Sequence, residues 1–231
     1  NYFMNKYDAK PSEIVLVASE DTHYSIAKGS NLLMLDWMKV PVEVENRKID
    51  TKAFEAQLQE AVTERKKYFI VFCNMGTTMF GSVDNPDDYS SVLEKYNLEY
   101  KIHIDGAYGG FVYPFSNENS TINFSNPKIS SITIDAHKML QAPYGTGIFI
   151  CRKGLIENVL TKEAQYVEGM DLTLCGSRSG ANAIAVWMIL FTYGPHKWFE
   201  KISVLQMRTQ FLCNELDKLE IKYFREPFMN I

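Results

Sequence analysis

Residues 68–78 have the sequence YFIVFCNMGTT, in which a continuous apolar run, Tyr68–Cys73, is followed by a polar turn that contains a glycine. A short apolar run without polar and apolar alternation is typical of a strand buried on both faces. Two further runs also stop at polar residues: KIHIDGA at 101–107 and SITIDAHK at 131–138. Such strands predict a sheet whose functional residues lie where the strands end.

The sequence on either side alternates between strand and helix patterns. Further strands are expected at Ile14–Ala18, Val40–Val44 and Gly147–Arg152. Helices are expected at Ser25–Leu35, from Thr51 onward with Phe54, Leu58, Ala61 and Val62 on one face, at Tyr89–Tyr96, at Ala183–Phe191 as a buried helix, and at Trp198–Leu219. This order predicts an α/β fold with a mostly parallel sheet covered by helices on both faces. Residues from Ile221 onward resemble the start of another unit.

Length and composition indicate one compact domain that binds a small molecule. The 231 residues are 46% apolar and 23% charged, which is ordinary for globular proteins. The net charge is -4, without a cluster of Lys and Arg, so no nucleic-acid partner is expected. The longest apolar run is about half of what a bilayer-spanning helix needs, so no membrane association is expected.

Cysteine usage favours a reducing compartment. The four cysteines are widely spaced, at Cys73, Cys151, Cys175 and Cys213, without a Cys-x-x-Cys pair. No secretory leader is evident. We therefore expect a cytoplasmic protein.

Three residues at predicted strand ends together match the needs of a pyridoxal cofactor. Taken singly, a histidine in a loop, an aspartate after a strand and a lysine are most often a surface group, a helix cap and a solvated charge. The cofactor needs a lysine amine for its imine, a carboxylate that keeps the pyridine nitrogen protonated, and a flat side chain against the ring. Lys138, Asp105 and His23 supply these groups. The small Ala107, two residues beyond Asp105, leaves room at the ring's second face.

Five ordered motifs resemble the group II pyridoxal-phosphate decarboxylases, a family that includes histidine, aromatic amino-acid, glutamate, serine, and tyrosine or aspartate decarboxylases. The motifs are EDTHYS at 20–25, NMGTT at 74–78, HIDGAYGG at 103–110, SITIDAHKM at 131–139 and GSRSG at 176–180. The resemblance runs from about Ile14 to Lys218. It implies the large cofactor-binding domain of the aspartate-aminotransferase-like, type I pyridoxal-phosphate fold.

The resemblance also implies a role for each matching residue. Lys138 would form the Schiff base, Asp105 would pair with the pyridinium nitrogen, and His23 would stack on the ring. His137 would lie beside the phosphate or the lysine, Thr77 or Thr78 would approach the ring oxygen, and Arg178 would lie near the substrate carboxylate. The implied activity is that of a lyase of carboxylic-acid metabolism, which decarboxylates an L-amino acid to its amine.

Two parts of the family pattern are not recognised in residues 1–231. The glycine- and serine-rich phosphate loop normally precedes the strand that leads to the stacking histidine, and a small C-terminal domain normally follows. We therefore expect one large domain without the N-terminal phosphate-loop segment and without the small domain. The tyrosine that protonates the substrate carbon in the family is not recognised either.

Other functions stay open at this stage. A different reaction of the same fold is one alternative: a desulfurase, with Cys175 as the only candidate thiol, an aldolase or a transaminase. A metal-dependent hydrolase would use the pairs His103/Asp105 and Asp135/His137, but such pairs are common by chance, and no metal is expected. A catalytically incomplete dimer partner is the third. The substrate is also open, because 131–143 resembles the tyrosine or aspartate branch and the Gly-Ser-Arg motif is shared with histidine and serine decarboxylases.

The resemblance further implies a homodimer with active sites at the subunit boundary. The segment Tyr108–Phe115 carries four aromatic residues directly after the cofactor aspartate. Aromatic residues dominate the buried centres of protein interfaces. We expect this segment to be buried at the subunit boundary rather than in its own domain.

Overall fold

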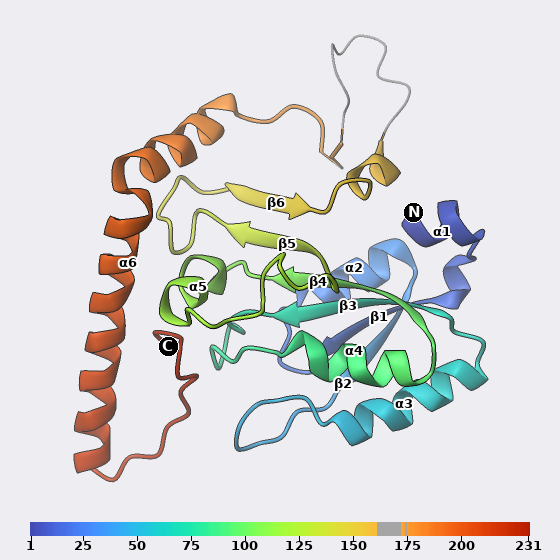
Figure 1. Cartoon of the computed structure of the whole chain (residues 1–231), viewed down its shortest axis with the longest axis horizontal. Coiled ribbons are helices and arrows are strands. Elements are labelled where there is room, and N and C mark those ends of the chain that lie inside the picture. Colours follow the sequence, from blue (N-terminus) through green and yellow to red (C-terminus); the bar gives the residue numbers. More distant parts are fainter. Residues whose placement is uncertain (161–171, 174) are drawn as a thin grey trace.

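The chain folds around one six-stranded sheet with the strand order β2-β1-β3-β4-β5-β6 (Figure 1). The computed structural model describes residues 1–160, 172–173 and 175–231. The strands are β1 (Ile14–Ser19), β2 (Asp36–Val40), β3 (Tyr68–Asn74), β4 (Glu99–Asp105), β5 (Ile129–Asp135) and β6 (Gly147–Cys151). The first five run parallel to one another and β6 is antiparallel to β5. The expected mostly parallel α/β fold is confirmed.

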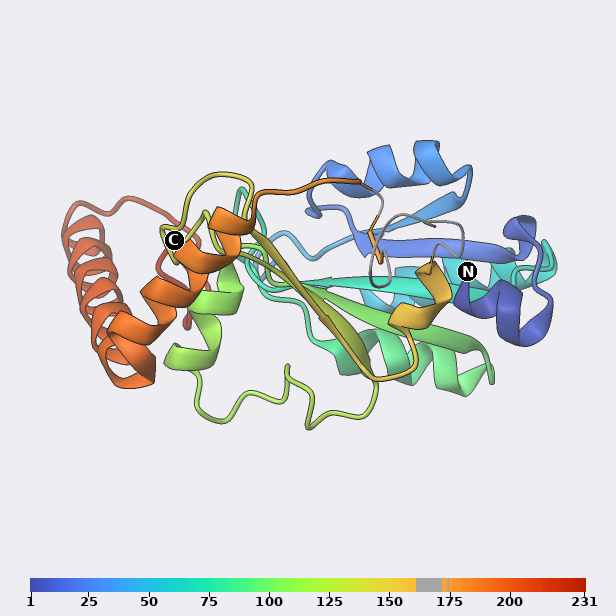
Figure 2. The same ribbon diagram turned by 90° about the horizontal axis from the view of Figure 1, so that it is seen from above.

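Helices cover both faces of this sheet. They are α1 (Tyr2–Tyr7), α2 (Ser25–Leu33), α3 (Thr51–Thr63), α4 (Pro86–Lys95), α5 (Tyr113–Ser116) and α6 (Gly180–Lys218), with short 3-10 turns at Pro11–Glu13, Gly109–Phe111 and Ile156–Val159. Figure 2 shows α2 on one face and α4 on the other, with α6 beyond the end of the sheet. No helix among the described residues is long and apolar enough to cross a membrane.

Strand β1 and helix α3, both expected from their apolar patterns, contribute buried residues to the core. Every residue of β1 is buried, which explains its unbroken apolar sequence. On α3, Phe54 and Leu58 are completely buried against the sheet. The Asp50 carboxylate caps this helix by accepting from the backbone N–H groups of Lys52 and Ala53. Sequence and packing therefore agree for β1 and for the Phe54 and Leu58 positions of α3.

The second strand lies four residues earlier than expected. β2 ends at Val40 because the next residue, Pro41, has no N–H with which to continue the ladder. The expected strand residue Val42 forms only an isolated bridge with Ile49. Val62, expected on the buried face of α3, is instead 39% exposed.

The expected buried helix Ala183–Phe191 is part of α6 and is largely exposed, which corrects that expectation. Trp187 and Phe191 are 61% and 76% exposed, and their rings stack on each other at 5.1 Å. α6 kinks at Gly194, whose φ of 60° departs from the helix just before Pro195. Apolar content alone does not place a helix in the core when no second layer covers it.

Residues after α6 return to the core of this chain. Met229 is completely buried, and the Gln206 amide donates to the Phe228 carbonyl at 3.0 Å. The Tyr108 hydroxyl donates to Asn230 at 3.2 Å. Figure 1 shows this segment passing from the far end of α6 back to α5.

The aromatic segment Tyr108–Phe115 packs in part within its own chain, with Tyr108, Phe111 and Phe115 partly exposed, and its burial at a subunit boundary stays a prediction. Tyr113 is buried, and Phe111 meets Trp198 of α6 edge to face at 5.8 Å. The Trp198 indole also donates to the Phe111 carbonyl at 2.9 Å. The long C-terminal helix provides the cover that the sequence alone did not reveal.

Gly109 permits the closest backbone contact beside the strand ends. Its N–H donates to the Met75 carbonyl at 3.0 Å, and a Cβ at this position would lie 2.1 Å from that oxygen. We expect Gly109→Ala to lower the free energy of unfolding by about 2 kcal/mol or more, because backbone must move.

The matched control is Gly29→Ala in α2, where a Cβ meets nothing within 4 Å. That change removes a flexible residue from a helix and should raise stability by about 0.5–1 kcal/mol. Denaturant unfolding of both variants measures the difference. Equal stabilities would show that the contact between Gly109 and Met75 is not close in the folded protein.

Candidate active site

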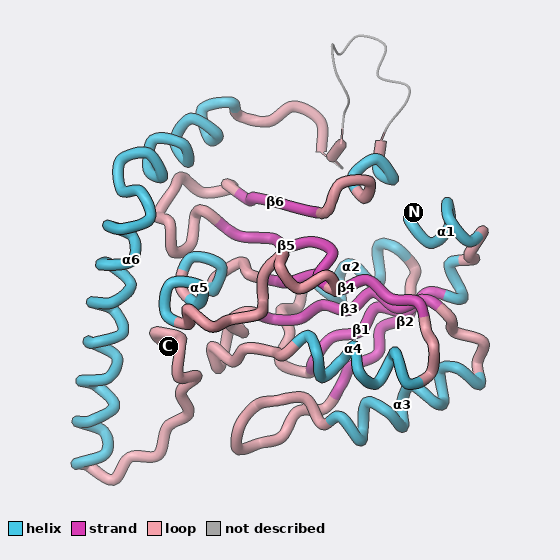
Figure 3. Tube along the Cα trace, viewed as in Figure 1, coloured by secondary structure: helices cyan, strands magenta, loops and turns pink. Residues whose placement is uncertain are grey.

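A cavity of about 320 Å³ lies where β1, β3, β4 and β5 end. The loops that follow these parallel strands meet at one edge of the sheet (Figure 3). The cavity is lined by His23, Ser25, Ile26, Phe72, Asn74, Gly76, Thr77, Thr78, His103, Asp105, Ala107, Thr133, Asp135 and Lys138. Six of the eight site residues expected from the sequence are therefore brought together.

Asp105 occupies the centre of this edge. It is the last residue of β4 and pairs in register with Asn74 on one side and with Thr133 on the other. The backbone N–H of Ala107 donates to the Asp105 carboxylate at 3.1 Å. This bond orients the carboxylate, and Ala107 adds no side-chain bulk above it.

Lys138 lies one turn beyond the end of β5. Its backbone N–H donates to the Asp135 carbonyl at 3.1 Å, which forms the turn that carries it. The Nζ atom lies 3.4 Å from Asp135 Oδ2, and the lysine side chain is 36% exposed. The amine thus faces the cavity edge with a carboxylate as its partner.

His23 reaches the cavity from the loop after β1. Its Nδ1 accepts from the Ser25 backbone N–H at 3.3 Å and lies 2.9 Å from the Ser25 hydroxyl. With Nδ1 used as an acceptor, the neutral ring carries its proton on Nε2. The ring also contacts Tyr24, with centroids 4.1 Å apart.

His103 is a cavity residue with a structural environment. Its ring stacks on Phe149 at 6.1 Å and meets Phe72 edge to face at 5.4 Å, while Nδ1 lies 2.9 Å from the Ser131 hydroxyl. Burial lowers the pKa of His103 from its ordinary 6.5 to about 4, against an opposing effect of Asp105. The imidazole is therefore neutral at physiological pH.

Two expected site residues do not line the cavity. His137 turns toward Tyr144, with ring centroids 5.2 Å apart, and its Nε2 is 3.7 Å from Asp135. Arg178 is exposed and donates to Thr173 and to the Cys175 carbonyl. Arg178 lies far from any strand end, whereas His137 directly follows β5 and its ring points to Tyr144 instead of the cavity.

The two expected threonines, Thr77 and Thr78, differ in exposure. Thr77 is buried, and its hydroxyl lies 2.7 Å from the Ser82 hydroxyl. Thr78 is exposed at the cavity edge. Thr78 is thus the better placed of the two to meet a bound group.

The alternatives drawn from the sequence gain no support from the described part of the chain. Cys175 is exposed and is not among the residues that line the cavity. Residues 1–160, 172–173 and 175–231 contain no group of three or more His, Cys, Asp or Glu side chains placed to hold a metal ion.

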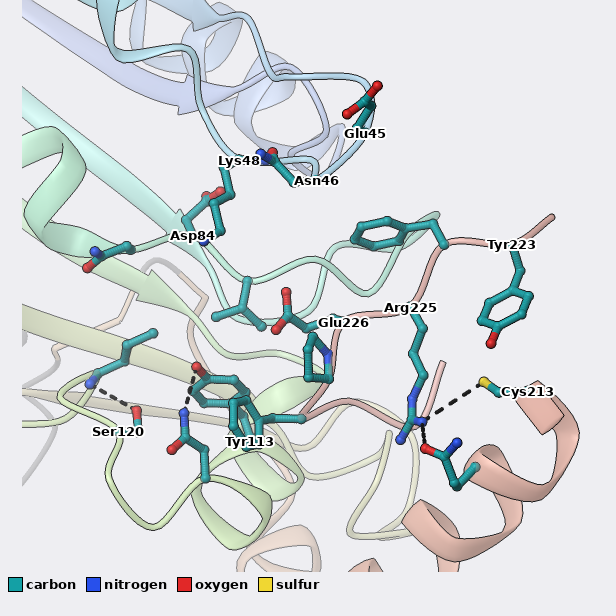
Figure 4. A pocket seen from close by; sticks show the side chains of 18 of the residues that line it. Glu45, Asn46, Lys48, Asp84, Tyr113, Ser120, Cys213, Tyr223, Arg225 and Glu226 are labelled. Atoms are coloured by element: carbon teal, nitrogen blue, oxygen red, sulfur yellow. Dashed lines mark hydrogen bonds between the residues drawn. The ribbon is translucent and has the colours of Figure 1, made fainter. Parts of the chain in front are cut away.

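A larger cavity of about 1350 Å³ lies elsewhere, between the C-terminal segment, the end of α6 and two loops. Figure 4 shows Glu45, Lys48 and Asp84 on one side of it and Arg225 and Cys213 on the other. Neither Lys138 nor Asp105 lines it. Size alone would therefore select a different cavity from the one that the strand-end residues line.

Sequence analysis assigned no role to one buried polar residue that lines the smaller cavity. Asn74 is 3% exposed and its amide bonds to three side chains: Ser19, Thr22 and Asp84. The available signal was an asparagine ending a buried apolar strand, a position where a polar side chain needs partners.

The residues at the cavity fit pyridoxal phosphate. A lysine amine, a carboxylate oriented by a backbone N–H, and an imidazole converge from three strand ends. These are the groups that bond the cofactor's aldehyde carbon, pair with its ring nitrogen and stack on its ring. A cavity at the carboxyl ends of parallel strands is also the usual place for a ligand in such sheets.

Comparison with known families and proteins gives the same result. The pyridoxal-dependent decarboxylase conserved domain matches residues 5–224. A tryptophan decarboxylase of Clostridium sporogenes is 58% identical over the whole chain, which covers 55% of that enzyme. A probable L-tyrosine/L-aspartate decarboxylase of Methanocella arvoryzae is 30% identical over 94% of the chain and 56% of its own length. The chain thus spans about half the length of the curated relatives it matches.

Solved structures show the same fold. A glutamate decarboxylase of Lactobacillus brevis superimposes with a TM-score of 0.76 at 21% identity, over 90% of this chain and 47% of that one. An L-methionine decarboxylase of Streptomyces gives 0.77 at 18% identity, over 94% and 59%. The expected fold of the type I pyridoxal-phosphate enzymes is confirmed.

The lowered pKa of His103 predicts acid-sensitive stability. Between pH 6.5 and about 4 the unfolded chain binds a proton that the folded protein does not, so the free energy of unfolding falls as the pH drops through this interval. His103→Asn retains a group able to bond Ser131 but has no imidazole to protonate. Its free energy of unfolding should therefore fall less than that of the wild type over this pH interval. The difference in pH dependence between wild type and variant should be about 3 kcal/mol at most.

Urea unfolding of both proteins at several pH values between 7 and 4 measures it, and their other titrating groups cancel in the comparison. If the two stability curves run parallel, the His103 ring binds its proton at the same pH in the folded as in the unfolded protein.

Proposed function

The chain belongs to the pyridoxal-dependent decarboxylase family, and we propose that the complete protein removes the α-carboxylate of an L-amino acid. The observation that carries the proposal is the convergence of Lys138, Asp105 and His23 on one cavity. The proposed substrate is L-tryptophan, because the relative that is 58% identical is a tryptophan decarboxylase. The cofactor is the pyridoxal group for which the family is named.

Each central residue has one proposed task. Lys138 Nζ holds the cofactor, and its present partner Asp135 then becomes free to accept other donors. Asp105, oriented by the Ala107 N–H, holds a proton at the pyridine nitrogen by charge pairing. His23 covers one face of the ring and Ala107 leaves space at the other. When bound, pyridoxal phosphate supplies the sink for the electron pair left as carbon dioxide departs.

The remaining expected residues have weaker geometric support. Thr78 and Thr77 line the cavity and are proposed to contact the ring oxygen. His137 is proposed to lie beside the lysine or the phosphate, supported by its 3.7 Å distance from Asp135, the partner of Lys138. Arg178 is proposed to meet the substrate carboxylate only if the segment that carries it moves, because it now bonds its own loop.

Assembly, location and domain content complete the proposal. Residues 1–231 are proposed to be the large cofactor-binding domain of a cytoplasmic homodimer. The four cysteines are all free, which suits a reducing compartment. Exposed apolar side chains on α6, such as Trp187 and Phe191, are typical of surfaces that contact another protein segment. Sedimentation of the complete protein at micromolar concentration tests the dimer, and a monomer would contradict it.

We expect Lys138→Ala to abolish the visible absorption of the bound cofactor and to leave the fold intact. The residue is partly exposed, so its loss removes little packing. Absorption spectra and thermal unfolding of the wild type and the variant measure the two effects. Lys153→Ala, a change at an exposed lysine that does not line the cavity, serves as the control. Retained cofactor absorption in Lys138→Ala would assign the amine to another residue.

Asp105→Asn should retain the cofactor but lose decarboxylation by about two orders of magnitude, because an amide cannot hold the ring nitrogen protonated. The measurement is carbon dioxide release with L-tryptophan, L-tyrosine, L-histidine and L-glutamate, at a matched content of bound cofactor. Near-normal turnover in the variant would contradict the role of Asp105. If wild type releases carbon dioxide from none of the four, the proposed substrate, L-tryptophan, is wrong.

A further inference from the structure

Asp84 is a buried carboxyl that does not line the active-site cavity but bonds Asn74, which does. It is 3% exposed and follows the turn that begins after Asn74. Its Oδ2 accepts from both the backbone N–H and the side-chain amide of Asn74, each at 2.8 Å. Its own N–H donates to the Asn74 carbonyl at 2.8 Å. The two residues are therefore joined by three hydrogen bonds, and the turn between them is closed.

This pairing decides which way the Asn74 amide points. A side-chain amide has a donor end and an acceptor end, and Asp84 Oδ2 accepts from the Asn74 backbone N–H as well, so the amide end that faces it is the donor. With Nδ2 held by Asp84 and by the Ser19 hydroxyl at 3.0 Å, Oδ1 must face away from them. In that direction Oδ1 accepts from the Thr22 hydroxyl at 3.0 Å.

Thr22 is the residue directly before His23, and its hydroxyl joins the His23 loop to the strand end of β3. The His23 ring itself contacts only its neighbours Tyr24 and Ser25 among the contacts described above. On the other side, Asn74 pairs in register with Asp105, and the next N–H, of Met75, donates to the Asp105 carbonyl at 2.8 Å. One asparagine thus connects the two residues proposed to contact the cofactor ring.

We propose that Asp84 is a positioning residue which, through Asn74 and Thr22, fixes the place of His23 relative to Asp105. The inference rests on the proposed function, in which His23 covers one face of the cofactor ring and Asp105 pairs with the ring nitrogen. Asp84 itself touches neither the cofactor nor the substrate. Its contribution is to hold the loop of the stacking ring at one distance from the strand end that carries the carboxylate.

The energetic cost of this carboxyl supports a role beyond packing. Burial raises the pKa of Asp84 to about 7, and the carboxylates of Asp21 and Asp88 add to the rise, while the bonds from Asn74 oppose it. A buried carboxyl that served only to fill space could be replaced by an apolar side chain without that cost. Its place beside the amide that accepts from the Thr22 hydroxyl agrees with an orienting task.

The test compares Asp84→Asn, Thr22→Val and the double variant in the complete protein. Asp84→Asn replaces the carboxyl oxygen that accepts both Asn74 bonds by that of a neutral amide, which weakens both bonds, and Thr22→Val removes the hydroxyl while preserving shape. We expect each to weaken cofactor binding about tenfold, in the range typical of residues that hold contacting groups in place. Because both act through one relay, the double variant should bind no more weakly than the weaker single variant.

Two further variants distinguish the relay from general destabilisation. Thr22→Ser retains the hydroxyl and should keep wild-type cofactor binding. Asp88→Asn changes a nearby carboxyl that does not bond Asn74, and should also leave binding within about twofold. Cofactor titration by absorption and the visible circular dichroism of the bound ring are the readouts, and the dichroism should shrink only in the relay variants. Unchanged binding in Asp84→Asn, or additive losses in the double variant, would overturn the proposal.

Hydrogen exchange of the protein without cofactor separates this inference from the proposed function. The Thr22 N–H donates to the Ser19 carbonyl at 3.1 Å and reports the order of the His23 loop. Asp84→Asn, but not Asp88→Asn, should speed exchange at this amide. If wild type binds no cofactor, the proposed function fails, and this exchange still decides on the relay. Unchanged exchange would reject it.

Discussion

The parallel pairing of β1, β3, β4 and β5 is the constraint on which the rest of the structure depends. Parallel strands carry all their carboxyl ends to one edge, so residues distant in sequence meet there without a dedicated scaffold. Asp105 at the end of β4 and Lys138 just beyond β5 are neighbours for this reason. His23 reaches the same edge from β1, on the other side of β3. The direction of the strands therefore brings the cavity residues together.

Parallel strands also leave polar groups at their ends in a buried place, and these groups need partners. At this edge the partners are the Ala107 N–H for Asp105, the last β5 residue Asp135 for the Lys138 amine, and Asp84 for Asn74. Each contact fixes the direction of a polar atom that would otherwise be free to rotate. The edge is therefore preorganised, which is what catalysis by orientation and charge requires.

The sheet and its edge were predictable because buried parallel strands have continuous apolar sequences with sharp polar ends. The runs ending at Asn74, Asp105 and Asp135 are all strands, and the residues that follow them line the cavity. The predicted strand at Val40–Val44 was misplaced for two reasons. The actual strand has the sequence DWMKV, which is not uniformly apolar, and Pro41 stops the hydrogen-bond ladder after it.

Features that depend on distant packing were not predictable. The exposure of Trp187 on α6 and the burial of Met229 are decided by which segments lie beside them. Apolar residues look alike in sequence whether a neighbour covers them or not. The same limit applies to Arg178, because a motif fixes its type but not the direction of its loop.

The most direct test of the account locates the cofactor on the chain. Borohydride treatment of the complete, cofactor-bound protein makes the bond between lysine and cofactor permanent, and peptide mass mapping then identifies the modified residue. The account predicts the added mass on Lys138, the lysine that lines the cavity at the strand ends. Added mass on any other lysine, with Lys138 unmodified, would contradict it.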